Sequence, residues 1–185
     1  IAVTNTPGAV TDATADVALT LMLMTARRAG EGERMLRAGQ WQGWHPTQML
    51  GQHVTGKTVG IIGMGRIGQA TARRCHYGFG MTVIFHNRSP LADAGLPATQ
   101  VPLATAMAAD FVVVAVPGSP ATRHLINAET LAQMAPHGIF VNISRGDVVD
   151  EAALVAALRN KTLAGAGLDV YEFEPKVSPD LMTME

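Results

Sequence analysis

Residues 58–68 read TVGIIGMGRIG, and this stretch decides the fold. Its first five residues, TVGII, are largely apolar and β-branched, as in a buried strand. The next six, GMGRIG, follow that strand directly and open a helical pattern over residues 65–77. A glycine-rich turn between a strand and a helix presents free backbone N–H groups and the positive end of the helix dipole, which together favour a bound phosphate.

Each glycine of this loop has a part in such a turn. Gly63 permits the tight turn, Gly65 lets the backbone approach a pyrophosphate closely, and Gly68 lets the helix pack on the strand. Between a strand and a helix, the pattern predicts dinucleotide binding, and a merely tight turn is the alternative.

A second phosphate motif competes with this loop. Residues 51–58 read GQHVTGKT, a literal match to the P-loop pattern. A P-loop must follow a strand and open a helix, whereas Lys57 and Thr58 come before the strand. The context favours a turn in which Gly56 leads into that strand.

Short apolar strands and helical segments alternate along the rest of the chain. This alternation indicates a parallel sheet covered on both faces, and right-handed crossovers make it doubly wound. The sequence therefore predicts an α/β fold with a doubly wound parallel sheet, a Rossmann-type NAD(P)-binding domain over residues 11–175. Strands are expected over 58–62, 82–85, 111–116, 139–143 and 164–170, and helices over 65–77, 103–109, 127–134 and 151–159.

A long helix is expected ahead of the sheet, with its body at residues 13–39. The side chain of Thr11 or Asp12 can cap its first turn. From residue 13 to 24 the helix is apolar nearly all round, so it should be buried on several sides. We expect a homodimer that pairs through residues 11–38, since two-fold dimers are the commonest oligomers.

A loop rich in Gly, Trp, Pro and His follows over residues 40–58, with Trp41 and Trp44 as expected packing anchors. Residues 1–10, which begin with Ile and carry no secretory signal, are expected to be a remnant or linker from a substrate domain. Residues 176–185 are expected to begin a return segment to that domain.

Composition narrows the possible partners and the location. The formal net charge is −1, so nothing indicates a nucleic acid or an anionic membrane as a partner. The apolar run 13–26 contains Asp16 and is too short to cross a bilayer, which takes about 20 residues. A single cysteine, Cys75, rules out an internal disulfide and fits a reducing, cytoplasmic location. No metal site is predicted.

The end of the second strand selects the coenzyme. An NAD enzyme carries an acid there for the ribose 2′-hydroxyl, whereas this chain has His86-Asn87-Arg88-Ser89. Arg88 can pair with a 2′-phosphate, and Asn87 and Ser89 can donate hydrogen bonds to it. The turn favours NADP(H), with NAD possible and a solvated turn with an incidental arginine as the alternative.

The chain resembles the D-isomer-specific 2-hydroxyacid dehydrogenases over nearly its whole length, and within them most resembles the glyoxylate/hydroxypyruvate reductase branch. The resemblance implies an oxidoreductase that transfers a hydride between NADP(H) and a small 2-oxo or 2-hydroxy acid such as glyoxylate or hydroxypyruvate. The matching stretches are NTPGAVTDATADVAL, GKTVGIIGMGRIGQ, FVVVAVPGSPATRHLIN, FVNISRGDVVDEAAL and AGLDVYEFEP.

The resemblance also implies roles at the reacting end. Arg145 matches the arginine that clamps the substrate carboxylate, a task that suits a guanidinium fork. Asp169 matches the aspartate that holds the nicotinamide carboxamide. Glu174 matches the glutamate that pairs with the catalytic histidine, and it argues against the formate dehydrogenase branch. Glu172 is expected to be solvated and without a role.

The remaining implied contacts are with the coenzyme. Backbone groups at three positions of the glycine loop would meet the pyrophosphate, and a strand end would flank the adenine. The residues that match are Met64, Arg66 and Ile67 at the pyrophosphate, Val116, Pro117 and Thr122 at the adenine, Thr14 near the nicotinamide-side phosphate or ribose, and Ile143 and Ser144 beside Arg145.

The family's catalytic histidine lies about twenty residues beyond the glutamate, in a Pro-His-x-Gly-Ser-like motif. No such motif occurs here, so we expect these residues to bind coenzyme in part but not to turn over substrate. His86 can touch the adenosine end, and each of the six histidines fits a surface, turn or packing role: His45, His53, His76, His86, His124 and His137.

Three alternatives remain from sequence alone. An NAD-linked relative such as a phosphoglycerate dehydrogenase would differ at the HNRS turn. A corepressor-like protein would use dinucleotide binding to control its assembly with protein partners. A chain that serves only as a dimerisation or coenzyme module would use the same apolar helix as its interface.

Overall fold

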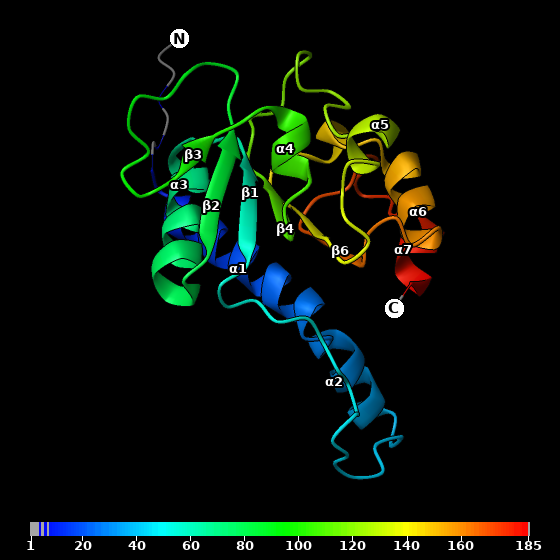
Figure 1. Ribbon diagram of the computed structural model, residues 1–185. Coiled ribbons are helices and arrows are strands. Elements are labelled where there is room, and N and C mark those ends of the chain that lie inside the picture. Colours follow the sequence, from blue (N-terminus) through cyan, green and yellow to red (C-terminus); the bar gives the residue numbers. More distant parts are fainter. Residues whose placement is uncertain (1–3, 5, 7, 185) are drawn as a thin grey trace.

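One sheet of six parallel strands forms the centre of the protein (Figure 1). The computed structural model describes residues 4, 6 and 8–184. The strand order is β3-β2-β1-β4-β5-β6, so the winding reverses between β1 and β4. The strands are β1 (Thr58–Ile62), β2 (Thr82–His86), β3 (Thr99–Gln100), β4 (Phe111–Val114), β5 (Ile139–Asn142) and β6 (Gly165–Leu168).

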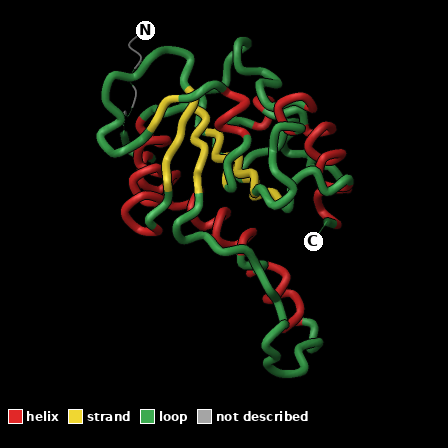
Figure 2. Tube along the Cα trace, in the orientation of Figure 1, coloured by secondary structure: helices red, strands yellow, loops and turns green. Residues whose placement is uncertain are grey.

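Helices cover both faces of this sheet (Figure 2). Side chains from α1 and α3 pack on one face, and side chains from α4, α5 and α6 pack on the other. The predicted doubly wound parallel sheet is therefore confirmed. The helices are α1 (Thr11–Ala26), α2 (Ala29–Arg37), α3 (Arg66–Arg73) with a π-helical turn (Arg74–Gly78), α4 (Leu103–Met107), α5 (Ala128–Leu131), a 3₁₀ turn (Gly146–Val148), α6 (Glu151–Arg159) and α7 (Pro179–Thr183).

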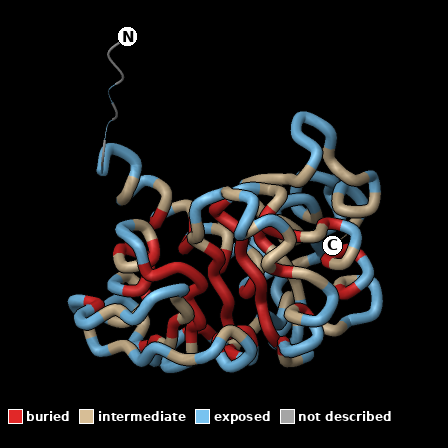
Figure 3. The backbone as a smooth tube through the Cα atoms, turned by 90° about the horizontal axis from the view of Figure 1, so that it is seen from above, coloured by how far each residue is buried: buried red, intermediate tan, exposed pale blue. Residues whose placement is uncertain are grey.

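Strand β4 shows why these strands are apolar without interruption. Phe111 and Val113 belong to the core on the α1 and α3 side, whereas Val112 and Val114 belong to the core on the opposite side. All four side chains are fully buried. Figure 3 shows the same arrangement, with the buried segments in the middle of the molecule and exposed backbone around them. Because no side chain of such a strand faces solvent, every position in it is apolar.

Two glycines let helices approach this sheet closely. A Cβ atom on Gly60 would overlap the carbonyl oxygen of Ala106 in α4, and one on Gly68 would overlap the carbonyl oxygen of Gly63. The packing role predicted for Gly68 is thus visible in the backbone contacts.

The N-terminal helical region is two helices, so the prediction of one helix over residues 13–39 is wrong. Arg28 lies between α1 and α2 with φ of 55°, in the left-handed region, which ends the α-helical path. Its Nε donates a hydrogen bond to Glu31 at 2.7 Å and its Nη1 donates one to the Leu50 carbonyl oxygen at 3.4 Å. These contacts stabilise the change in chain direction between α1 and α2.

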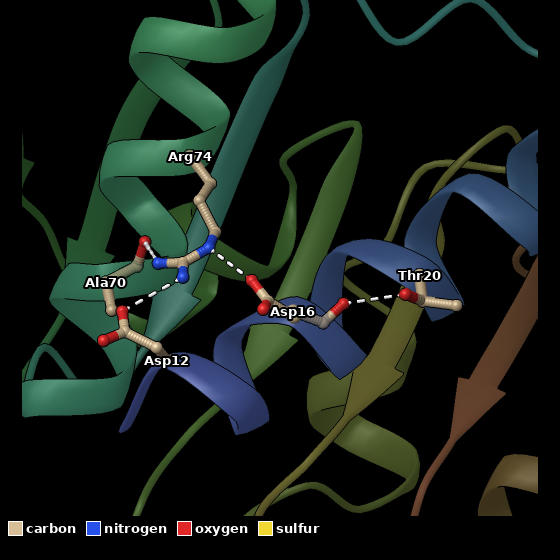
Figure 4. Close-up of polar contacts among 5 residues, drawn as sticks. All are labelled: Asp12, Asp16, Thr20, Ala70 and Arg74. Carbon is tan, nitrogen blue, oxygen red and sulfur yellow. Dashed lines mark hydrogen bonds and ion pairs between the residues drawn. The ribbon is translucent and has the colours of Figure 1, made fainter. Parts of the chain in front are cut away.

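The first turn of α1 has no side-chain cap, contrary to the prediction for Thr11 or Asp12. Asp12 instead accepts a hydrogen bond from Arg74 at 3.0 Å, and Asp16 accepts another from the same guanidinium at 2.7 Å (Figure 4). Arg74 also donates to the carbonyl oxygen of Ala70 at 3.1 Å. This network fastens α1 to the end of α3.

Residues 29–52, the arm, project from the body of the protein (Figures 1 and 2). Trp41 and Trp44 are 53% and 77% exposed, so the prediction that they anchor the loop by packing is wrong. Leu36 and Leu50 are also exposed. Helix α1 buries only one face in this chain, and Met24 lies on its exposed side. No helix in residues 8–184 is long and apolar enough to cross a membrane.

Most element bounds agree with the prediction at the amino ends of strands and differ at their carboxyl ends. Predicted strands 111–116, 139–143 and 164–170 end earlier, at Val114, Asn142 and Leu168. The first residue beyond each end still donates its N–H to the last residue of the neighbouring strand: Ala115 to Ile62, Ile143 to Val114 and Asp169 to Asn142. The loops that follow form the edge at which ligands of open α/β sheets bind.

Candidate functional site

The glycine loop crosses the carboxyl end of β1 and leads into α3. Gly63 has φ of 100°, and a Cβ atom there would lie 2.8 Å from the carbonyl oxygen of Ala115. A Cβ atom on Gly65 would meet no other atom within 4 Å, so the space beside this glycine is open. The N–H groups of Arg66 and Ile67, in the first turn of α3, have no carbonyl partner within the helix.

Two cavities meet at this loop, and Gly65, Val116 and Pro117 line both. The turn cavity, of about 430 Å³, extends toward the end of β2. The arginine cavity, of about 590 Å³, extends toward the end of β5. The predicted residues of the turn cavity are Gly63, Met64, Gly65, His86, Asn87, Arg88, Ser89, Val116, Pro117 and Thr122. Those of the arginine cavity are Gly65, Arg66, Ile67, Val116, Pro117, Ile143, Ser144 and Arg145.

A larger cavity, of about 860 Å³, lies elsewhere, between α6 and residues 173–180. It contains none of the predicted site residues and is away from the glycine loop. Size alone would favour it, but ligands of open parallel sheets bind at the carboxyl ends of the strands. The two cavities at the glycine loop are therefore the candidate site.

The end of β2 is fastened to the glycine loop through Asn87. The side-chain oxygen of Asn87 accepts a hydrogen bond from the Met64 N–H at 3.0 Å. The Met64 N–H is thus engaged within the protein, which leaves the N–H groups of Arg66 and Ile67 for a phosphate. His86 points its Nδ1 toward the carbonyl oxygen of Val101, at 3.2 Å.

Gln100 of β3 holds the same turn from its other side, a role that no sequence pattern indicated. Its Nε2 donates to the carbonyl oxygens of Asn87 at 3.3 Å and Ser89 at 3.2 Å. Its Oε1 accepts a hydrogen bond from the Leu91 N–H at 3.0 Å. Arg88 and Ser89 are exposed.

Arg145 follows β5 on a turn that Asn142 shapes. The buried Asn142 side chain accepts hydrogen bonds from the N–H and hydroxyl of Ser144, at 3.0 and 2.6 Å, and donates one to the Arg145 carbonyl oxygen at 3.2 Å. A Cβ atom on Gly118 would lie 2.8 Å from Arg145 Cγ, so the arginine stem crosses this glycine. Sequence reasoning missed Asn142, because an amide ending an apolar strand has many possible roles.

The side chain of Glu172 is buried, which corrects the expectation that it is solvated. Its side chain is 6% exposed, and its carboxylate accepts hydrogen bonds from His124 Nε2 at 2.7 Å and from the Glu151 N–H at 3.1 Å. The Glu151 carboxylate accepts one in return from the Glu172 N–H, at 3.1 Å. Arg123 Nη2 lies 3.5 Å from the same Glu172 carboxylate. Glu172 therefore joins three segments of chain.

Glu174, the predicted catalytic carboxylate, is exposed and accepts a hydrogen bond from the Tyr171 N–H at 2.8 Å. Its loop touches the loop of Arg145, because a Cβ atom on Gly146 would overlap the Tyr171 carbonyl group. The two predicted catalytic residues thus lie on adjoining loops.

Besides Gly68 and Glu174, two further predicted residues, Asp169 and Thr14, line neither cavity. Asp169 directly follows β6, is exposed, and donates its backbone N–H to the Asn142 carbonyl oxygen at 3.0 Å. Thr14 is half-buried on α1, whereas Thr11, one turn earlier, lines the arginine cavity. The P-loop-like stretch lies before β1, where Gly56 adopts φ of 73° in a turn, as the context predicts.

Cys75 lies in the core on the α1 side of the sheet. Burial raises the pKa of its thiol to about 12, which keeps it protonated and unreactive. Within residues 8–184 and residues 4 and 6, no group of three or more His, Cys, Asp or Glu side chains could hold a metal ion.

The sequence of residues 19–185 matches the profile of the "D-isomer specific 2-hydroxyacid dehydrogenase, NAD binding domain". The chain belongs to the D-isomer-specific 2-hydroxyacid dehydrogenases. The match to the NAD-binding domain of this dehydrogenase family agrees with the six-stranded parallel sheet and with the glycine loop at its carboxyl edge.

Relatives of this dehydrogenase chain carry reductase names. A glyoxylate reductase from Thermococcus kodakarensis is 49% identical and aligns with 100% of this chain and 57% of its own length. A glyoxylate/hydroxypyruvate reductase B from Serratia proteamaculans is 44% identical over 97% of this chain and 57% of its own. The chain thus spans less than two thirds of each of these two relatives.

A crystal structure shows the same domain in a larger dehydrogenase. The NADPH-dependent glyoxylate/hydroxypyruvate reductase from Sinorhizobium meliloti, in complex with NADP and malonate, superposes with a TM-score of 0.89 at 44% sequence identity. The superposition covers 100% of this chain and 57% of that one.

Proposed function

We propose that this chain forms the coenzyme-binding domain of a reductase that transfers a hydride from NADPH to a small 2-oxo acid such as glyoxylate or hydroxypyruvate. The observation that carries the coenzyme choice is the turn after β2. Arg88 lines the same cavity as the glycine loop, and the described lining of that cavity contains no carboxylate side chain. A guanidinium attracts a 2′-phosphate that a carboxylate would repel.

In this proposal the coenzyme extends across both cavities. Its adenosine 2′-phosphate lies beside Arg88, with Asn87 and Ser89 as further donors, and the adenine lies near Val116, Pro117 and Thr122. Its pyrophosphate meets the first turn of α3, where the N–H groups and the helix dipole favour an anion. The open space beside Gly65 supports this placement of the coenzyme, since both cavities are lined by that glycine.

The substrate end of the proposal rests on the family. Arg145 would bind the substrate carboxylate through its guanidinium fork, and Glu174 would pair with a catalytic histidine. Asp169 and Thr14 would contact the nicotinamide half. Among the chain's own histidines, His124 contacts Glu172 and His137 contacts Asp110, and none of the six is in the described lining of the arginine cavity. We therefore propose that residues 1–185 bind coenzyme without turnover.

We also propose a homodimer that pairs through α1 and the arm. The exposed Leu36, Trp41, Trp44 and Leu50 support it, because large apolar side chains that are exposed on a projecting segment favour a protein interface. Light scattering of the purified chain should give twice the monomer mass, and Trp44→Ser should shift it toward the monomer. We further propose a cytoplasmic location for the protein, which the buried, unpaired Cys75 fits.

Titration calorimetry of NADPH and NADH with this chain tests the proposed coenzyme. We expect tighter binding of NADPH, and we expect Arg88→Ala to remove the difference by weakening NADPH binding alone. Arg159→Ala is the matched control, because Arg159 contacts Asp180 away from both cavities. Tighter binding of NADH by the unmodified chain would contradict the proposal and favour an NAD-linked relative.

A further inference from the structure

The side chain of Gln100 is bonded to backbone at three positions of the turn that follows β2. Its amide nitrogen donates to the carbonyl oxygens of Asn87 and Ser89, and its amide oxygen accepts the Leu91 N–H. These partners lie 9 to 13 residues before Gln100 in the sequence. Gln100 therefore joins the turn to the edge strand β3.

These bonds decide which way the peptide groups of the turn face. In a trans peptide the carbonyl and the following N–H point in opposite directions. The Asn87 carbonyl faces Gln100, so the Arg88 N–H faces away from it. Gln100 does not line the turn cavity, whereas residues 86–89 do. The turn thus lies between Gln100 and the cavity.

The electrostatic consequence favours an anion in the cavity. A carbonyl oxygen carries partial negative charge and would repel a phosphate at close range. Gln100 holds two such oxygens, those of Asn87 and Ser89, on the side of β3. The Arg88 N–H is thereby left for the other side, as in backbone sites for anions, whereas the Ser89 carbonyl precedes Pro90, which has no N–H.

The turn is also fastened at its start, where Asn87 Oδ1 accepts the Met64 N–H at 3.0 Å. Arg88, which is exposed, lies between the attachments at Asn87 and Ser89. A turn held at both ends loses less conformational entropy when it binds a ligand than a free loop does. Preorganisation of this kind raises affinity without any contact between Gln100 and the ligand.

We propose that Gln100 is a positioning residue for coenzyme selection, which holds the Asn87–Leu91 turn in the conformation that receives the 2′-phosphate. This inference rests on the proposed NADP(H) function. It assigns the choice of coenzyme to a side chain on β3 as well as to Arg88.

The test uses the whole chain with Gln100→Met, which keeps the length of the side chain and removes its three hydrogen bonds. NADPH and NADH are titrated into each variant, and 2′,5′-ADP and 5′-ADP serve as probes without a nicotinamide. We expect the Kd for NADPH and 2′,5′-ADP to rise about tenfold, because the turn loses the hydrogen bonds to Gln100 that hold it in its binding conformation. The Kd for NADH and 5′-ADP should change by less than about twofold, on the same reasoning.

Two controls separate positioning from damage to the fold. Gln133→Met removes a glutamine of equal size outside both cavities, and it should leave all four affinities unchanged. The thermal midpoint of Gln100→Met should stay close to that of the unmodified chain, because Gln100 is exposed. If Gln100→Met lowers the affinity for NADPH relative to NADH but leaves the thermal midpoint unchanged, a merely structural role does not explain the result.

The other outcomes overturn the inference in different ways. If Gln100→Met weakens all four ligands equally, or none, while Arg88→Ala removes the NADPH preference, Gln100 has no role in selection and the proposed function stands. If Arg88→Ala also leaves the NADPH and NADH affinities unchanged, the proposed NADP(H) preference fails, and the role of Gln100 fails with it.

Discussion

The Glu172 carboxylate and the His124 imidazole meet at 2.7 Å, although 48 residues separate them in the sequence. The second oxygen of the same carboxylate accepts the Glu151 N–H. One buried acid thus joins the loop after β4, which carries Thr122, to the loop after β6, which carries Glu174. The two ends of the proposed site are connected through this side chain.

Removing this carboxylate should loosen both loops. We expect Glu172→Ala to lower the free energy of unfolding by about 1–3 kcal/mol, because it leaves the Glu151 N–H and the His124 imidazole without their partner. Urea unfolding measures the change. Glu129→Ala, at an exposed position in the first turn of α5, should cost only a few tenths of a kcal/mol through the helix dipole. Equal losses in the two variants would contradict the joining role.

Two glycines of the same loop should respond to alanine in opposite ways. In Gly68→Ala the new methyl group meets the Gly63 carbonyl oxygen, so the free energy of unfolding should fall by about 1–3 kcal/mol through overpacking. In Gly65→Ala the methyl group meets no protein atom, and φ of −77° suits alanine, so stability should not fall.

Coenzyme binding separates these two variants further. Gly65→Ala should weaken NADPH binding at least about tenfold, because the methyl group occupies the place where the backbone would approach the pyrophosphate in the proposed site. Thermal unfolding and calorimetry on the same samples make the comparison. Full affinity in folded Gly65→Ala would show that the pyrophosphate does not cross this glycine.

The hydroxyl of Thr71 should contribute nothing to stability. Among the described side chains, Thr71 Oγ1 is the buried nitrogen or oxygen atom that has no hydrogen-bond partner. Thr71→Val keeps the shape and removes the unpaired group, so the free energy of unfolding should stay the same or rise by up to about 1 kcal/mol. Thr130→Val is the contrasting variant, because Thr130 Oγ1 accepts the Asn127 N–H at 2.8 Å in a capping box. Thr130→Val should lower the free energy of unfolding by about 1 kcal/mol. A larger loss in Thr71→Val than in Thr130→Val would contradict this assignment.

Stability at low pH should depend on Asp110. Partial burial acts to raise its pKa, but hydrogen bonds from the Thr58 N–H and His137, with the charges of Lys57 and His137, outweigh burial and hold the pKa below its ordinary value. A carboxyl whose pKa is lower in the folded than in the unfolded chain stabilises the fold above its unfolded pKa of about 3.9. That contribution is lost as the pH falls through the folded-state pKa.

Asp110→Asn tests this dependence. The variant should be less stable than the unmodified chain at pH 7, and the difference should shrink as the pH falls from about 5 toward 3 and below. Urea unfolding at a series of pH values measures it, with Asp93→Asn in an exposed loop as the control. A difference that stays constant across this range would rule out the proposed linkage.

The sheet and the glycine loop could be predicted from the sequence because their signals are local. The strand β1, the loop 63–68 and the start of α3 are consecutive, and each has its own pattern of apolar residues or glycines. The strand β3 has only two residues, Thr99 and Gln100, and leaves no periodic pattern. Sequence reasoning therefore missed this strand, and the role of Gln100 with it.

The other errors come from contacts between distant segments. Arg28 adopts a left-handed conformation that glycine, asparagine or aspartate usually occupies, so nothing in its type indicated a break. Glu172 and Glu174 are two residues apart in an irregular loop, where no period tells which one faces inward. Only the positions of His124 and Glu151 decide that Glu172 is the buried one.

The hydrogen bond from Met64 to Asn87 has a consequence for engineering of coenzyme preference. Asn87 is a structural member of the turn, whereas Arg88 is the proposed recognition element for the 2′-phosphate. An exchange confined to Arg88 and Ser89 would alter the recognised ribose group and leave the scaffold intact. An exchange that includes Asn87 would detach the turn from the loop beneath it, so a graft of the whole segment from an NAD-dependent relative has to bring its own acceptor for the Met64 N–H.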